Sequence, residues 1–114
     1  MISREIINIL SEAIKLRKSV VLKYDTPGDN AKGERIGYPH ALYVHTSTNN
    51  ILFDLFQIQG DSSNPLVAGG NWREFDVKYV TSIRIKGDIF NVQNGYKSNS
   101  PRYRRAIIKI EDVV

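Results

Sequence analysis

The sequence predicts a mainly β (α+β) domain in which an N-terminal helix packs on a small, strongly bent antiparallel barrel of about five strands. Two observations lead to this fold class. Apolar residues near the N-terminus recur at helical spacing, and the rest of the chain contains short alternating segments separated by turn-forming residues. At 114 residues, of which 41% are hydrophobic, the chain can bury one modest core. A small twisted sheet buries its apolar face by curling against a helix.

The N-terminal helix is expected over residues 3–18. Ile6, Leu10 and Ile14 recur at every fourth position and therefore lie on one helix face. Ser3 is expected at the N-cap, because its side-chain oxygen can accept a backbone N–H of the first turn. The basic residues at the end of this segment suit the negative end of the helix dipole.

Five extended segments are expected, at residues 20–24, 35–46, 51–59, 72–77 and 80–86. The third segment is apolar on both faces at its start, which is typical of a central strand. Pro39 lacks a backbone N–H, so it marks an edge or a bulge of the second segment. A weak strand is expected at residues 89–92, whereas residues 106–110 fit either a strand or a helix.

The net charge of +4 is concentrated in one segment of the chain. Residues 96–105 contain Lys97, Arg102, Arg104 and Arg105 and no acid, and the rest of the chain is balanced. Arginines can bind phosphates and the tyrosines of this segment can stack on unpaired bases, a combination suited to single-stranded nucleic acid. A solvated tail, or a strand with its charges outward, explains the segment equally well.

Several classes of site are not expected. The chain has no cysteine, which excludes a disulfide, a thiolate zinc site and a cysteine nucleophile. Its two histidines, His40 and His45, are five positions apart in a predicted strand and would face opposite sides, so we expect no metal site and no cofactor. The aspartates form no recognisable close pair and no nucleophile motif is present, so we expect no catalytic residue. Without a long apolar run or an export signal, we expect a cytoplasmic protein with no membrane partner.

A series of short motifs extends over residues 6–86: an Ala-Ile pair in the helix, a strand ending in tyrosine, an arginine, a proline, a hydrophobic strand, and Arg-x-Phe before an aliphatic strand. These motifs are Ala13, Ile14, Tyr24, Arg35, Pro39, residues 51–56, Arg73, Phe75, Val80 and Ile83. Their order resembles the WYL domain family. Where that family has Trp-Tyr-Leu this chain has Ile51, Leu52 and Phe53, and Lys78 and Tyr79 stand where a later arginine is usual.

The chain is also similar to short, stand-alone members of that family, through Gln57, Gly60, Ser62, Trp72, Arg73 and Phe75. The resemblance implies an SH3-like or Sm-like barrel over residues 1–88, followed by a basic C-terminal extension, residues 89–114, that packs on the domain or trails from it. It further implies a ligand-sensing regulatory module of bacteria or phages without catalytic activity. The ligand implied is a nucleotide or a single-stranded nucleic acid.

The charged segment and the resemblance together give a set of candidate ligand-binding residues. These are Arg35, Gln57, Arg73, Lys97, Arg102, Tyr103, Arg104 and Arg105. Gln57 begins, and Arg73 ends, a long connection between two strands, so both are placed at the mouth of the barrel. A strand that simply emerges into water explains Gln57 equally well.

Structural roles are expected for Tyr24, Pro39, Asp54, Trp72 and Phe75. For Trp72, packing over the end of the core, with the indole N–H bonded to a carbonyl, is favoured over ligand stacking. Asp54 lies in an apolar strand and requires a partner, which is either a buried arginine, with Arg35 as a candidate, or a set of backbone donors.

Two functions remain open at this point. The first is a non-catalytic binding module for a nucleotide or single-stranded nucleic acid. The second is an assembly module, in which a barrel edge or the helix pairs with another copy or another protein, and the basic segment binds an acidic partner.

Overall fold

The computed structural model describes residues 1–28, 33–60 and 70–111. Helix α1 (Ser3–Leu16) precedes the strands β1 (Lys18–Tyr24), β2 (Glu34–Val44), β3 (Ile51–Gly60), β4 (Asn71–Asp76), β5 (Val80–Ile89) and β6 (Ala106–Lys109). Two short 3-10 helices, η1 (Val77–Tyr79) and η2 (Pro101–Tyr103), lie between strands. The segment predicted as strand or helix near the C-terminus is therefore a strand, and the weak strand predicted at residues 89–92 does not form beyond Ile89.

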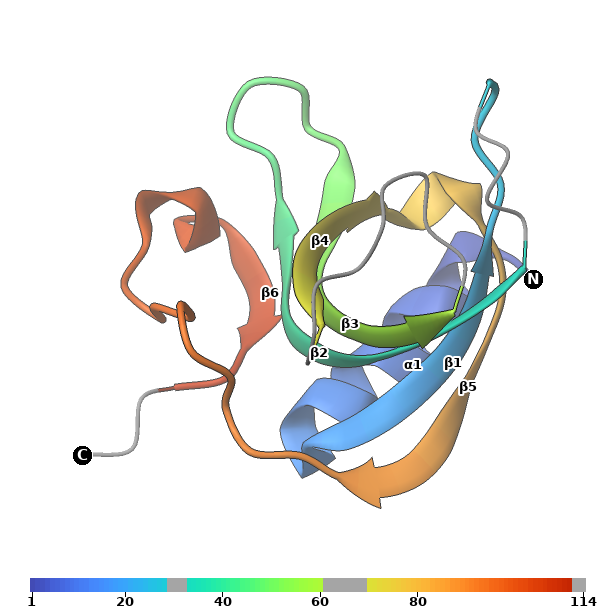
Figure 1. Ribbon diagram of the computed structural model, residues 1–114. Coiled ribbons are helices and arrows are strands. Elements are labelled where there is room, and N and C mark those ends of the chain that lie inside the picture. The colour runs from blue at the N-terminus through green and yellow to red at the C-terminus, as the bar shows by residue number, and fades with distance from the viewer. Residues whose placement is uncertain (29–32, 61–69, 112–114) are drawn as a thin grey trace.

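The six strands form one antiparallel sheet in the order β4-β3-β2-β1-β5, with β6 pairing to β2 (Figure 1). β1 pairs with residues 34–37 of β2, and β6 pairs with residues 41–43. Because β3 occupies the other edge of β2, β1 and β6 share one edge. Within the described residues no pairing joins β4 to β5, so the mostly β fold with one packed helix is confirmed, whereas a closed barrel is not.

Pro39 lies at a bulge of β2. The ladder between β2 and β3 shifts register between Pro39 and Ala41, which removes the need for a proline N–H at this point. Of the two alternatives that the sequence left for Pro39, the bulge is the one observed, and β2 is an interior strand rather than an edge.

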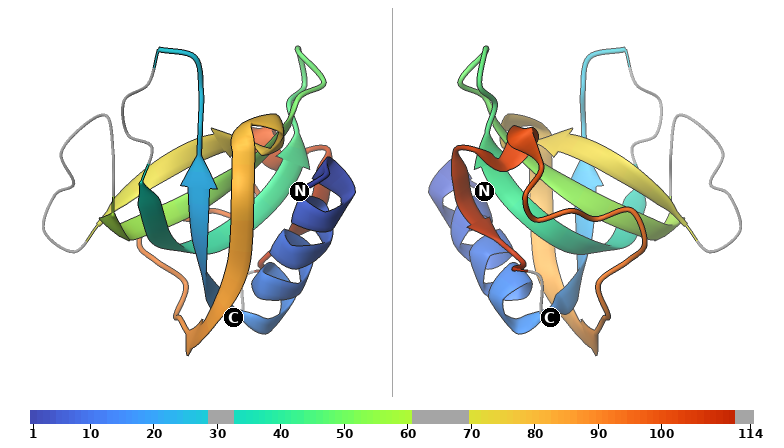
Figure 2. Two further views of the ribbon diagram at one scale, coloured as in Figure 1. Left: turned by 90° about the vertical axis from the view of Figure 1, so that its right-hand side faces the viewer. Right: turned by 90° about the vertical axis from the view of Figure 1, so that its left-hand side faces the viewer.

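Helix α1 covers the main core with the apolar face that its spacing predicts. Ile6, Leu10 and Ile14 are buried, and the helix contacts β1, β2, β5 and β6 (Figure 2). The N-cap prediction was wrong: Ile2 occupies the N-cap position, and its backbone N–H donates to the carboxylate of Glu5 at 3.3 Å. The carboxylate thus accepts the N–H of the N-cap residue itself, rather than an N–H of the first turn as expected of a serine hydroxyl.

Tyr24 and Phe75 are both buried in the main core, with ring centroids 4.7 Å apart in an edge-on arrangement. The Tyr24 hydroxyl accepts the backbone N–H of Asp76 at 2.8 Å, which links the end of β1 to the end of β4.

A second buried cluster lies on the opposite face of β3. Phe53 and Leu55 belong to the main core, whereas Leu52 packs with Tyr43 and Tyr103 in the second cluster. Residues 90–105 run over this face before β6 joins β2 (Figure 1). Both faces of β3 are therefore covered, as predicted for a central strand. Among the described helices, none is long and apolar enough to cross a membrane.

Candidate functional site

A concavity of about 410 Å³, here called the main hollow, lies between the β3–β4 pair and the segment before β6. It is lined by Asp54, Trp72, Arg73, Glu74, Gly95, Tyr96, Lys97, Ser100, Arg102 and Tyr103. Antiparallel register places Glu74 beside Asp54, and Trp72 beside Phe56. Because alternate residues of a strand share a face, Trp72 and Glu74 both project toward the C-terminal segment.

The aromatic wall of the main hollow is built around Trp72. Its indole N–H donates to the carbonyl of Asn94 at 2.8 Å, which is the kind of partner expected from the sequence. The ring meets His40 and Phe56 edge-on, with centroid distances of 4.6 and 5.3 Å, and lies nearly parallel to Tyr96 at 6.4 Å. Trp72 is half-buried and takes no part in the main core, so it covers the outer face of the sheet.

His40 fixes the position of the segment that carries Tyr96. Its ring is fully buried, Nδ1 lies 2.8 Å from the carbonyl of Tyr38, and Nε2 lies 3.1 Å from the backbone N of Gln93. A carbonyl only accepts and a backbone N–H only donates, so Nδ1 carries the proton and Nε2 accepts. Burial lowers the pKa of His40 to about 4. His40 is therefore a buried, hydrogen-bonded residue.

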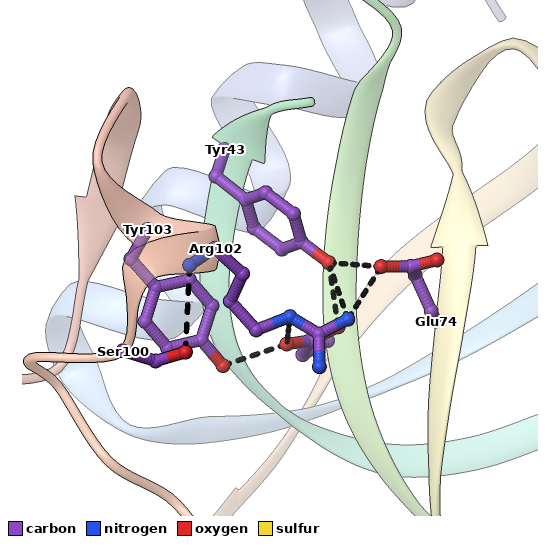
Figure 3. Close-up of polar contacts among 6 residues, drawn as sticks. Tyr43, Glu74, Ser100, Arg102 and Tyr103 are labelled. Carbon is purple, nitrogen blue, oxygen red and sulfur yellow. Dashed lines mark hydrogen bonds and ion pairs between the residues drawn. The ribbon is translucent and has the colours of Figure 1, made fainter. Parts of the chain in front are cut away.

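Five polar side chains form a connected network at one end of the main hollow, here called the Asp54 cluster (Figure 3). Asp54 accepts hydrogen bonds from the hydroxyls of Tyr43 and Tyr103, at 2.9 and 2.6 Å, and its Oδ2 lies 3.3 Å from Nε of Arg102. Nη2 of Arg102 contacts Glu74 at 2.5 Å and the Tyr43 hydroxyl at 3.1 Å. The Asp54 cluster therefore joins β2, β3 and β4 to η2.

The hydroxyl of Tyr43 lies between the two carboxyl groups of the Asp54 cluster. Its hydroxyl oxygen lies 2.9 Å from Asp54 and 2.5 Å from Glu74, but it has only one proton to donate. Burial raises the pKa of Asp54 and is not fully offset by Tyr103 and Arg102. Burial also raises the pKa of Glu74, but hydrogen bonds from Tyr43 and Arg102 outweigh it, and the net shift is downward. The two carboxyl groups therefore differ: the pKa of Asp54 lies above its usual value and that of Glu74 lies below it.

The remaining members of the Asp54 cluster keep their protons. Burial, followed by hydrogen bonding to the carboxyl groups, raises the pKa of Tyr43 and of Tyr103, so both hydroxyls remain donors. Burial opposes the charge on Arg102, but Asp54 and Tyr43 outweigh it and raise the guanidinium pKa.

The predicted partner of Asp54 was wrong. Arg102, from a turn distant in sequence, forms the ion pair that we expected of Arg35. Arg35 is 3% exposed, and its guanidinium carbon lies 5.4 Å from the Tyr24 ring centroid and 5.3 Å from that of Phe75. A planar cation against two ring faces is a packing arrangement at the main core, away from the main hollow.

The structure brings together only part of the predicted ligand-binding set. Arg73, Lys97, Arg102 and Tyr103 line the main hollow, whereas Arg35 and Gln57 do not. Gln57 is fully buried. Its side chain therefore lies neither at an open pocket mouth nor in water, the two locations that the sequence left open. The connection expected to unite Gln57 and Arg73 includes residues 61–69, which lie outside the described residues.

The last two arginines of the charged segment lie outside the main hollow. Arg105 donates from Nη1 to the side-chain carbonyl of Asn49 at 2.6 Å, next to the turn that joins β2 and β3. Arg104 lines a second concavity, here called the lateral hollow, beside η2. A third, smaller concavity of about 190 Å³ is lined by residues around Tyr43, Glu74 and Arg102.

Sequence reasoning missed Tyr43 and Glu74. Tyr43 occupies the face of β2 opposite to Leu42, and an apolar or aromatic residue on both faces of a strand is itself a signal of a second packed layer. Glu74 lies on the same face of β4 as Trp72 and Asp76. It gives no local signal in the sequence, because only the register with β3 places it beside Asp54.

No protein-family model, curated protein or solved structure matched the chain. The resemblance to the WYL domain family therefore remains a prediction from short motifs. Within the described ranges, no group of three or more acidic or histidine side chains is placed to hold a metal ion.

Proposed function

We propose that the protein is a non-catalytic binding module whose main hollow holds a nucleotide or a short single-stranded nucleic acid. One observation carries the proposal. Arg73, Lys97, Arg102 and Tyr103, which the sequence alone suggested as ligand-binding residues, converge on one hollow although they come from two distant parts of the chain. A basic segment that merely trailed into solvent would have no reason to meet Arg73.

The size and walls of the main hollow suit this class of ligand. A volume of about 410 Å³ is within the range of small-molecule sites. Trp72 and Tyr96 lie nearly parallel in its wall, and aromatic faces of this kind stack on nucleobases without strong sequence preference. Trp72 is fixed by its hydrogen bond to Asn94, so little side-chain entropy remains to be lost on stacking.

The charges in the main hollow indicate where a phosphate would lie. Glu74 and Asp54 surround one side of the Arg102 guanidinium and would repel a phosphate there. Lys97 is exposed and forms no ion pair with any described residue, so it is the better phosphate contact. We therefore assign Lys97 to the phosphate, and the Asp54 cluster to positioning Arg102 and Tyr103.

The proposal includes the finer features that the sequence resemblance implies. The strong curvature of the sheet supports an SH3-like or Sm-like barrel related to the WYL domain family (Figure 1). A cytoplasmic regulatory module of bacterial or phage origin, which senses its ligand and carries out no reaction, is consistent with a main hollow built from stacking and charge-bearing groups.

The test uses Trp72, the only tryptophan of the chain, as a fluorescent reporter. Titration with AMP and with a hexathymidylate at low salt is expected to quench its emission, and the affinity should fall steeply as salt rises. Lys97→Gln should weaken binding severalfold, whereas Lys15→Gln, the same charge change on the exposed face of α1, should leave it unchanged. Absence of quenching and of any binding by a second method would contradict the proposal.

A second candidate function, self-association, is favoured by one observation. β5 pairs only with β1 among the described strands, and its C-terminal Ile89 is 77% exposed, so a long strand edge is open to another copy. Light scattering after size exclusion tests this candidate. A dimer that is lost on replacing Ile89 by lysine would support it, and a monomer at all concentrations would exclude it.

A further inference from the structure

The lateral hollow adjoins the main hollow across η2. It has a volume of about 330 Å³ and is lined by residues 98–101, Tyr103, Arg104 and Lys109. Ser100 and Tyr103 line both hollows, so they form the partition between them. The Tyr103 hydroxyl is held by Asp54 at 2.6 Å, and the partition is therefore fixed rather than free to close one hollow.

The two hollows differ in charge. In the main hollow the carboxyl groups of Asp54 and Glu74 accompany the cations. No carboxylate is among the described residues that line the lateral hollow, and Arg104 is exposed and has no ion pair in that part of the chain. Lys109 donates one hydrogen bond, to the carbonyl of Ser98 at 2.7 Å, and an ammonium group has two further protons to donate.

The polar lining of the lateral hollow is that of an anion site rather than of a base-stacking site. Besides the two cations it offers the side chains of Ser98, Asn99 and Ser100, which can donate to phosphate oxygens. Tyr103 is its only aromatic residue, and the hydroxyl of that ring is already engaged. A phosphate, with several acceptor oxygens and no face to stack, matches these groups.

We infer that the lateral hollow is a second subsite, which binds a backbone phosphate of the same ligand whose base occupies the main hollow. The ligand is then a single-stranded oligonucleotide that passes over η2, and a mononucleotide fills only part of the site. This inference rests on the function proposed above, because it assumes that a nucleotide occupies the main hollow.

The experiment compares AMP with hexa-adenylate at one salt concentration, using the wild type, Arg104→Gln and Arg105→Gln. The two arginines are adjacent and exposed, so both variants make the same charge change, but Arg105 lines neither hollow and bonds to Asn49 instead. We expect the hexanucleotide to bind the wild type at least about tenfold more tightly than AMP, since a second phosphate contact is added. Arg104→Gln should weaken hexanucleotide binding about fivefold and leave AMP binding unchanged. For the hexanucleotide, the slope of the logarithm of the binding constant against the logarithm of the salt concentration should fall in magnitude by roughly 0.7 in this variant. Arg105→Gln should change both affinities little.

Three results would overturn the inference. Equal affinity for AMP and hexa-adenylate would mean that the ligand does not extend beyond the main hollow. Equal effects of the two arginine variants would reduce the lateral hollow to general surface charge. Competition by polyglutamate as strong as by the hexanucleotide would point to an acidic protein segment instead. In each of these cases AMP binding can persist, and the function proposed for the main hollow then stands; if neither AMP nor the hexanucleotide binds, both proposals fail.

Discussion

The buried imidazole of His40 predicts a specific loss of stability on mild acidification. Because Nε2 accepts the backbone N–H of Gln93 and Nδ1–H donates to Tyr38, a second ring proton would oppose the N–H of Gln93. Burial lowers the pKa of His40 from 6.5 to about 4, so the unfolded chain takes up the proton first as the pH falls. The contribution of neutral His40 to the free energy of unfolding is therefore fully present above about pH 6.5 and is lost progressively toward pH 4.

The magnitude follows from the two pKa values. A full shift of this size corresponds to about 3 kcal/mol, at about 1.4 kcal/mol for each pKa unit. Between pH 7 and pH 5 the linkage relation gives a loss of about 2 kcal/mol from His40 alone. In a protein whose total stability is roughly 5–15 kcal/mol, a decrease of this size is easily measured.

The assay is urea unfolding, followed by fluorescence and circular dichroism, at a series of pH values from 7 to 5. His40→Gln is the matched variant, since glutamine can still accept the Gln93 N–H but does not titrate. His45 is retained in both proteins, so the difference between their stability curves isolates His40. The variant should start less stable at pH 7 and show a much flatter decline. Parallel curves for the two proteins between pH 7 and 5 would refute the reasoning.

Further predictions concern the Asp54 cluster and one glycine. Tyr103→Phe should lower the free energy of unfolding by about 1–2 kcal/mol, because Asp54 loses a buried donor, whereas Tyr38→Phe, which removes a hydroxyl with no hydrogen bond in the described chain, should have little effect. Asp54→Asn should lower the free energy of unfolding by about 1–2 kcal/mol, because an amide accepts at one oxygen only and loses the ion pair with Arg102, and Asp54→Leu should cost at least about 2 kcal/mol; an unchanged urea midpoint in the asparagine variant would contradict the assigned contacts. Gly60→Ala places a Cβ 2.1 Å from the carbonyl oxygen of Glu34 and should destabilise by more than about 2 kcal/mol, whereas Gly87→Ala, at a similar positive φ in open space, should cost about 1 kcal/mol. Equal urea midpoints for the two alanine variants would show that the contact at Gly60 is relieved without cost.

The elements that the sequence predicted well are those with a local signal. Apolar spacing located α1, and alternation located β1 to β5, because burial of one face imposes its period on the residues within each element. The helix was predicted from Ser3, where it starts, but the N-cap was placed one residue too late, at Ser3 instead of Ile2. Ser3 and Glu5 both offer a cap, and only Glu5 satisfies an N–H at the N-cap. The strand character of β6 depends on its pairing with β2, and four residues carry too little pattern to decide it.

The candidate site was predictable in composition but not in assembly. Charge and aromatic content identified residues 96–105, and the motif pattern identified Arg73. The partner of Asp54 could not be chosen between Arg35 and Arg102, because both are arginines and the choice depends on the β3–β4 register and on the position of η2. Glu74 became a neighbour of Asp54 through that same register, which no local pattern encodes.

The division of one edge of β2 between β1 and β6 has a consequence for how ligand binding could be sensed. The walls of the main hollow belong to two parts of the protein, the β3–β4 pair and the segment that β6 attaches to residues 41–43 of β2. A ligand that contacts both parts stabilises the state in which β6 is paired with β2. This stabilisation grows with the ligand concentration relative to the dissociation constant. Occupancy of the main hollow would thus be reported as slower hydrogen exchange of residues 41–43. Release of the ligand would make that short stretch of strand edge less protected and more open to pairing with another chain.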